Sequence, residues 1–281
     1  MHKIGKDLYV ETTLPGVNVG ALVTAEGIIC IDAPTHPADA RRWRQKLMQI
    51  SSRPILFVIN LDHHRDRVLS NQWLEAPVIA HELAYERMRA LPELYKLSTP
   101  DTGADSERVE EWAGLRVVAP QITFVERLTL IRGGHEIRLV HRPGVSPGAI
   151  WAELPNDNVV FTGDTVTHKV PPFLHEADLN TWLETLADAR KKKTIAKVVV
   201  PGRGGLTDKD GFKHTEDFLK LARRKVEALA RTKKARAEVL SLAHDLLGGF
   251  TATGDLRELY TRRLRAGLEH LYDALAVAPT R

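Results

Sequence analysis

Short apolar runs alternate with turn residues over the first 35 positions, and this pattern predicts the strands of a meandering sheet edge. The candidate strands cover residues 9–12, 17–24 and 27–32. Residues 36–49 predict a helix, because Pro37 suits a first helical turn and Trp43 and Leu47 are spaced to share one face. The apolar run 55–59 predicts a buried strand. A strand, a helix and a strand in this order indicate an α/β layered fold.

The middle of the chain continues this alternation, with one polar interruption. Further elements are predicted as strands at 77–80 and 198–200, a β-rich block at 122–161, and helices at 82–89 and 179–190. Residues 98–114 are rich in Ser, Thr, Asp and Gly, which predicts an exposed loop or a flexible insert.

From His214 the sequence consists almost entirely of helix-forming residues with amphipathic spacing. The apolar stripe of a last helix, at 256–275, consists of Leu259, Leu264, Leu268, Leu271 and Leu275. We expect two or three helices packed on the α/β body or on a second copy of the chain, as a homodimer. The predicted organisation is therefore an α/β domain over residues 1–212 and a C-terminal helical extension over residues 213–281.

Composition is that of an ordinary globular protein, with 27% charged and 43% hydrophobic residues over 281 positions. No apolar run approaches the roughly 18 residues that a membrane-spanning helix needs, and residues 1–6 lack the apolar core of a secretion signal. Cys30 is the only cysteine, which excludes an internal disulfide and a cysteine-based metal cluster. We expect a cytoplasmic protein without a membrane partner, in which Cys30 is a small buried strand residue.

Positive charge is concentrated at the C-terminal end. From Lys213 onward, 14 Lys and Arg residues face 9 Asp and Glu, whereas the first 212 residues hold 26 against 27. Basic clusters at 223–225, 233–236 and 262–265 raise nucleic-acid binding as an alternative function. It is the weaker one, because Asp and Glu accompany these clusters and aromatic residues for base stacking are scarce.

The segment after the predicted strand at 55–59 carries the densest set of side chains that can bind a metal. It reads Asn60-Leu61-Asp62-His63-His64-Arg65-Asp66-Arg67. Histidines and carboxylates on a loop after a strand are typical of metal-dependent hydrolases. Arginine stays protonated and cannot bind a cation, so the segment combines the pattern of a metal site with a residue that opposes it.

Four stretches, in order, resemble motifs of the metallo-β-lactamase superfamily, and the resemblance covers roughly residues 8–210. Residues 62–67 resemble the motif His-x-His-x-Asp-His, and His-Arg-Pro-Gly-Val-Ser-Pro-Gly at 141–148 resembles His-x-Pro-Gly-His-x-Pro-Gly. Phe-Thr-Gly-Asp at 161–164 is intact, and Pro-Gly-Arg-Gly at 201–204 is similar to Pro-Gly-His-Gly. The resemblance implies a four-layer αββα sandwich, followed here by the helical extension.

The resemblance also implies two metal positions that share a bridging water, and the first one is partly preserved. It corresponds to Asp62, His64 and Val145, with Asp164 as the bridging carboxylate. Valine cannot bind a metal, but the other three residues are legitimate ligands for a single Zn, Mn or Fe(II) ion. His141 corresponds to a position that does not bind metal, and we expect it to make a structural hydrogen bond.

The second metal position corresponds to Asp66, Arg67 and Arg203, again with Asp164. Two guanidiniums in place of histidines would repel a cation. Without metal, however, convergent carboxylates would repel one another by several kcal/mol per pair at close range, at an effective dielectric near 20. We therefore hypothesise that Arg67 and Arg203 replace the second metal, with a protonated His64 completing the charge balance.

Two functions follow from this comparison. The leading prediction is a metallo-β-lactamase-fold protein without metal-dependent hydrolysis and without a cofactor, which serves as a binding, regulatory or scaffold protein for an unidentified small or anionic ligand. The alternative is a mononuclear hydrolase of an ester, lactone, thioester or phosphodiester. It would hold one Zn, Mn or Fe ion on Asp62, His64 and Asp164 and use Asp66 as the base.

Overall fold

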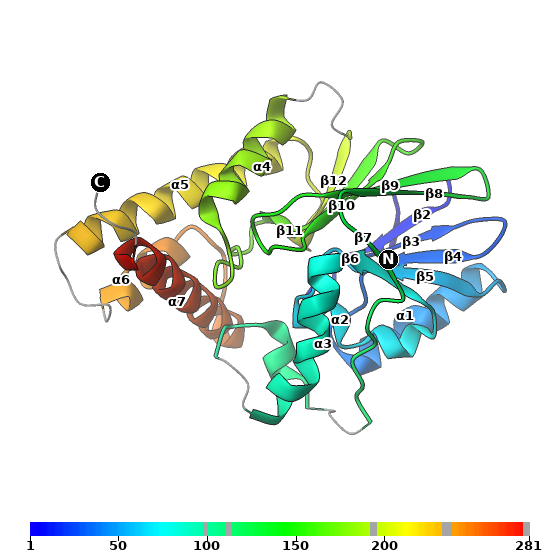
Figure 1. The fold of residues 1–281 in the computed structure, drawn as a ribbon, viewed down its shortest axis with the longest axis horizontal. Coiled ribbons are helices and arrows are strands. Elements are labelled where there is room, and N and C mark those ends of the chain that lie inside the picture. The colour runs from blue at the N-terminus through cyan, green and yellow to red at the C-terminus, as the bar shows by residue number, and fades with distance from the viewer. Residues whose placement is uncertain (98–100, 111–113, 192–195, 232–237, 278–281) are drawn as a thin grey trace.

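The computed structural model describes residues 1–97, 101–110, 114–191, 196–231 and 238–277, and within them the strands form two sheets (Figure 1). The first sheet has seven strands in chain order: β1 (His2–Lys3), β2 (Leu8–Glu11), β3 (Val19–Val23), β4 (Ile28–Ile31), β5 (Ile55–Ile59), β6 (Val78–His81) and β7 (Ile122–Phe124). The second has five, in the order β12 (Val198–Gly204), β11 (Val159–His168), β10 (Ile150–Leu154), β9 (His135–His141) and β8 (Arg127–Arg132).

Strand direction follows the apolar pattern of the sequence. The runs β4, β5 and β6 pair in parallel, as expected for strands that bury both faces. β8 and β9 form an antiparallel hairpin whose turn contains Gly133 and Gly134, both with positive φ. β11 and β12 are again parallel, so their carboxyl ends lie at one edge of the second sheet.

Helices cover the outer faces of both sheets (Figure 1). The helical segments are α1 (Pro37–Ile50), α2 (Arg65–Val68), η1 (Asn71–Leu74), α3 (Glu82–Leu97), η2 (Asp105–Arg108), α4 (Leu179–Lys191), α5 (Asp210–Arg231), α6 (Val239–Leu247) and α7 (Gly254–Val277). Trp43 and Leu47 of α1 pack on the first sheet beside the buried Cys30. Leu8 and Phe161 belong to a core between the two sheets. These layers confirm the predicted αββα sandwich.

The C-terminal helices share one apolar core with the second sheet. Trp151 of β10, Trp182 of α4, Val226 of α5 and Leu264 of α7 belong to the same buried cluster. Apolar residues of the extension therefore pack within the chain, including Leu259, Leu264, Leu268 and Leu271 of the predicted stripe, all of which are buried. The boundary at 212 and the homodimer remain predictions.

The predicted exposed loop is the clearest difference from the sequence analysis. Residues 98–100 and 111–113 lie outside the described residues, but 103–106 between them are buried rather than exposed. They include the start of η2, and the backbone N–H groups of Asp105 and Ser106 donate to the carboxylate of Asp66. Polar side chains of this segment also have partners within the protein, because Thr102 donates to Glu107 and Asp105 pairs with Arg203. A separate expectation concerned membranes: among all the residues described, no helix combines the length and apolarity needed to cross one.

Candidate functional site

The candidate site lies where strand ends of the two sheets meet. Asp32 directly follows β4, and the segment that begins at Asn60 directly follows the parallel strand β5. Asp164 lies in β11 and Arg203 in its parallel neighbour β12. A backbone hydrogen bond of 2.8 Å from the N–H of Ile150 to the carbonyl of Leu61 joins the two sheets beside this point.

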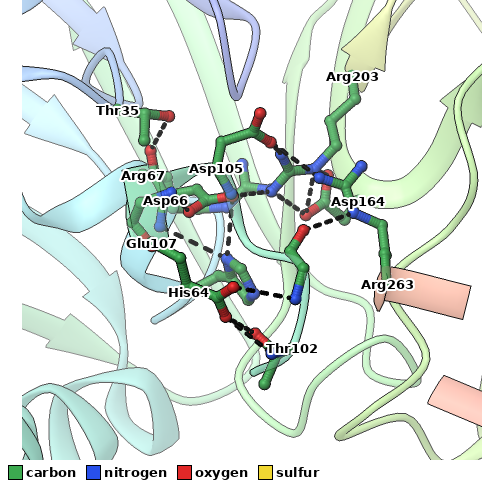
Figure 2. Close-up of polar contacts among 12 residues, drawn as sticks. Thr35, His64, Asp66, Arg67, Thr102, Asp105, Glu107, Asp164, Arg203 and Arg263 are labelled. Carbon is green, nitrogen blue, oxygen red and sulfur yellow. Dashed lines mark hydrogen bonds and ion pairs between the residues drawn. The ribbon is translucent and has the colours of Figure 1, made fainter. Parts of the chain in front are cut away.

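Eight buried charged side chains converge there, and we call them the ion-pair network. Its members are the carboxylates of Asp32, Asp62, Asp66, Asp105 and Asp164 and the guanidiniums of Arg67, Arg203 and Arg263. Figure 2 shows several of them, contributed by strands, by the 101–110 segment and by the C-terminal helix. Five carboxylates face three guanidiniums, so two negative charges are not balanced within the network.

Arg67 is the centre of one half of the network. It comes from α2, a single helical turn inside the His/Asp segment, and its side chain is fully buried. Its guanidinium contacts three carboxylates: Asp32 at 2.5 Å, Asp62 at 2.8 Å and Asp164 at 2.9 Å. Burial opposes the charged form, but these three anions outweigh it and raise the pKa of Arg67 above its usual value. Arg67 is therefore permanently charged.

Arg203 is the centre of the other half. It reaches Asp105 at 2.6 Å, Asp66 at 2.7 Å and Asp164 at 3.2 Å. Burial again opposes ionisation, and the surrounding carboxylates, led by Asp164, raise its pKa. Asp164 lies between the two arginines, so it links the halves.

The carboxylates respond differently to this environment. Burial favours their neutral forms, but Arg203 and Arg67 lower the pKa of Asp164 to about 2. Arg203, His64 and hydrogen bonds from Ser106 also lower that of Asp66. For Asp32, burial prevails over Arg67 and raises the pKa to about 6. At pH 7 all three are ionised.

His64 does not supply the expected positive charge. Burial is the main cause that lowers the pKa of its imidazole to about 4, so the ring is neutral at pH 7. The ring packs edge-on against Phe173, with 4.3 Å between centroids, and its Nδ1 accepts a long hydrogen bond, 3.5 Å, from the backbone N–H of Asp66. The hypothesis of a protonated His64 is therefore wrong.

The remaining predicted pocket residues have contacts of other kinds. Val145 packs in the apolar cluster with Ala149 and Trp151. His141 donates from Nε2 to the carbonyl of Pro147 at 2.8 Å and stacks on His81, with ring centroids 3.9 Å apart. The structural hydrogen bond expected for His141 is thus confirmed.

Sequence reasoning missed three members of the network. Asp32 carried a detectable signal, because it ends a strand parallel to β5 and the carboxyl ends of parallel strands share an edge. It even adopts a left-handed conformation, with φ of 57°, and its carboxylate accepts from the N–H of Leu61. Asp105 and Arg263 carried none, because they lie in a polar segment and in a helix distant from every motif.

Asp62, His64 and Asp164 were the candidate ligands for a single metal. Asp62 accepts from the backbone N–H of His64 at 2.7 Å in addition to its contact with Arg67. In the part of the chain that the structure describes, no three His, Cys, Asp or Glu side chains are grouped so that they could hold one metal ion.

Comparisons with known proteins agree on the fold. The family model of the metallo-beta-lactamase superfamily matches residues 13–244. A metallo-beta-lactamase from Pontibacter korlensis superposes with a TM-score of 0.63 at 20% identity, covering 78% of this chain and 97% of its own. A metallo-beta-lactamase family protein from Thermus thermophilus superposes with a TM-score of 0.69 at 20% identity, covering 96% and 94%.

The stereoselective inverting sec-alkylsulfatase Pisa1 from Pseudomonas sp. is also similar, with a TM-score of 0.68 at 16% identity, but only 49% of its length is covered, against 97% of this chain. At these identities the structural likenesses establish the fold alone, whereas the family model covers most of the chain. The chain belongs to the metallo-beta-lactamase superfamily.

Proposed function

We propose that this chain is a metal-independent member of its superfamily, in which the ion-pair network takes the place of the dinuclear metal centre and the protein acts by binding rather than by metal-dependent hydrolysis. The observation that carries the proposal is the pair of buried guanidiniums, Arg67 and Arg203, that share the carboxylate of Asp164. Each has three carboxylate partners, as a metal ion in a carboxylate-rich site would.

The donor set does not fit two metal ions. Arg67 and Arg203 stand at two positions where the superfamily resemblance implies histidine, and Val145 stands at a third. A guanidinium offers only N–H donors, and it would repel a cation at the same carboxylates. Removing the arginines from these carboxylates would also leave buried anions without a counter-charge, which costs several kcal/mol.

The mononuclear alternative has less support. Asp62 and Asp164 would have to exchange Arg67, at 2.8 and 2.9 Å, for a metal ion. Asp66 would have to act as a base, but Arg203 and two backbone N–H groups hold its carboxylate. Burial raises its pKa, but Arg203 and hydrogen bonds from Ser106 prevail and lower it. A general base works best with a pKa near the working pH, so a stabilised carboxylate is a poor one.

Metal analysis tests the proposal directly. Protein would be produced in medium supplemented with zinc, manganese and iron, purified without chelators and measured by inductively coupled plasma mass spectrometry. We expect far less than one metal ion per chain. An ester, lactone, thioester and phosphodiester panel should show no turnover above a chelator-treated sample.

The contrary result is equally specific. Stoichiometric metal, together with turnover that Asp164→Asn abolishes, would overturn the proposal. Glu75→Gln is the matched control, because it neutralises an exposed acidic side chain outside the network, the partner of Arg44.

A further inference from the structure

Two arginines of the network share one oxygen of one carboxylate. Arg203 approaches Oδ2 of Asp105 at 2.6 Å and Arg263 approaches the same atom at 2.9 Å. Both guanidiniums also lie against the ring of Phe173, with their central carbons 4.8 and 4.5 Å from its centroid. Two cations beside one aromatic ring form a compact receptor for a carboxylate, and Figure 2 shows Arg203 and Arg263 converging on Asp105 from different elements.

Asp105 is the outermost part of this arrangement. Its side chain is 11% exposed, whereas those of Arg203 and Arg263 are 2% and 1% exposed. It belongs to the 101–110 segment, while the arginines belong to β12 and α7. The carboxylate therefore covers two guanidiniums that regular elements hold in place, beside Phe173 of the loop that follows β11.

The backbone of Asp105 has a partner that its side chain does not share. Its backbone N–H is held separately, by the carboxylate of Asp66 at 3.0 Å. The outer contacts of the segment are ion pairs of Asp101 and Glu107 with Arg262, at 3.2 and 3.3 Å, in which Asp101 is half exposed. The pair with Asp101 is exposed and contributes little to stability, so this end of the segment can adjust, whereas Glu107 is 6% exposed.

The charge of the network selects the ligand class. Carboxylates already exceed guanidiniums by two, so an entering group can carry only the single negative charge that Asp105 removes. A dianion such as a phosphate monoester would add a further negative charge to a buried cluster. An apolar or aromatic portion of the ligand would contact the rings of Phe173 and Tyr260, which both lie beside Arg263.

We propose that Arg203, Phe173 and Arg263 form a binding site for an organic monocarboxylate, and that Asp105 occupies this site as an internal competitor. The inference rests on the proposed function, because it gives the metal-independent network a ligand class. Displacement of Asp105 by the ligand would break the contact of its carboxylate with Arg263 of α7, while Gly103 and Glu107 keep the segment in contact with this helix.

Benzoate is the probe, and titration calorimetry of the full chain at constant ionic strength is the measurement. Asp105→Ala should bind benzoate at least tenfold more tightly than the unaltered protein, because the competitor is gone. Adding Arg263→Gln to that variant should weaken benzoate binding at least tenfold. Asp101→Ala, which removes a carboxylate from the same segment outside the site, should behave as the unaltered protein does.

Ligand controls separate charge from shape. Benzamide, which is neutral, and phenyl phosphate, a dianion, should both bind more weakly than benzoate. Asp105→Asn keeps the shape of the side chain, so it provides the measurement if Asp105→Ala does not fold. Equal benzoate affinity in the Asp105 variants and the unaltered protein, or preference for phenyl phosphate, would overturn the inference.

The two proposals fail in different ways. If benzoate does not bind and the protein remains free of metal, only the inference about the ligand is lost. Stoichiometric metal in the purified protein would overturn the proposed function and the inference together.

Discussion

At the residue scale, the chemistry of this protein depends on how buried charges are paired. Arg203 contacts Asp66, Asp105 and Asp164, and its side chain is 2% exposed. An intact buried ion pair stabilises the fold little more than apolar residues of similar volume would. Removing one partner, however, leaves the other charges buried and uncompensated, which is strongly destabilising. Arg67 and Arg203, which have three carboxylate partners each, should therefore be needed for folding, whatever ligand the protein binds.

Arg203→Met removes the guanidinium and keeps much of the side-chain volume. We expect a loss of about 3–5 kcal/mol in the free energy of unfolding, because three buried carboxylates lose their partner. Urea denaturation measures it. Arg44→Met is the matched control, because the pair of Arg44 with Glu75 is exposed and should contribute less than about 1 kcal/mol. Equal effects of the two substitutions would contradict a structural role for the network.

His64 makes stability depend on pH. Its pKa is about 4 in the folded protein and 6.5 in the unfolded chain, so the unfolded chain binds the proton first as the pH falls. The stabilisation from the neutral ring is full above pH 6.5 and is lost between pH 6.5 and 4, at a cost of roughly 3 kcal/mol.

The test compares His64→Gln with the unaltered protein in urea denaturation between pH 7 and 4. The comparison is necessary because Asp32, whose pKa is raised to about 6, has the opposite effect over an overlapping range. The stability difference between the two proteins should change in favour of the variant as the pH falls. A difference that is constant over this range would show that His64 does not titrate as described.

At the element scale, α7 is joined to the 101–110 segment by backbone proximity as well as by charge. Gly103 has φ of 71°, and a Cβ there would lie 2.3 Å from the backbone nitrogen of Arg263. Its carbonyl accepts from Nε of Arg263 at 3.1 Å. Only glycine permits this approach, so the segment and the helix are fitted to each other at one residue.

Gly103→Ala should therefore detach the segment from α7. Gly114→Ala is a close control, because Gly114 has φ of 74° but no atom within 4 Å of an added Cβ. Both variants incur the left-handed backbone penalty of roughly 1–2 kcal/mol, and only Gly103→Ala incurs the clash. Hydrogen exchange at the amides of Asp105 and Ser106 should accelerate in Gly103→Ala alone. Equal protection in both variants would contradict the close packing.

At the scale of the whole molecule, the helical extension and the sandwich share a core. Phe212, Leu219 and Val226 of α5 belong to the cluster that includes Trp182 and Leu186 of α4. Arg263 of α7 adds a buried charge to the network. The extension thus contributes to the core and to the candidate site at once.

A chain that ends at Lys209 should not fold cooperatively, because the outer face of the second sheet and α4 would lose their cover. Thermal unfolding followed by near-ultraviolet circular dichroism measures this, and sedimentation velocity of the full chain tests the predicted homodimer. A truncated chain with a sharp transition would support an independent domain at residues 1–212 and contradict the shared core.

The sequence by itself determined the fold and five of the eight members of the ion-pair network. Apolar periodicity and strand-end motifs are local properties, so they located β4, β5 and β12, and the polar residues in or directly after them. The resemblance of four motifs to those of the metallo-β-lactamase superfamily then implied which of these residues are neighbours: Asp62, Asp66, Arg67, Asp164 and Arg203.

Only the tertiary structure decided which charges are paired and what closes the site. Asp105 and Arg263 reach the network from a polar segment and from the C-terminal helix, 158 positions apart, and no local pattern connects them. Their partners depend on three-dimensional packing, and so does the burial that keeps His64 neutral. Coulomb interactions in a buried cluster depend on distance in space, which sequence spacing does not record.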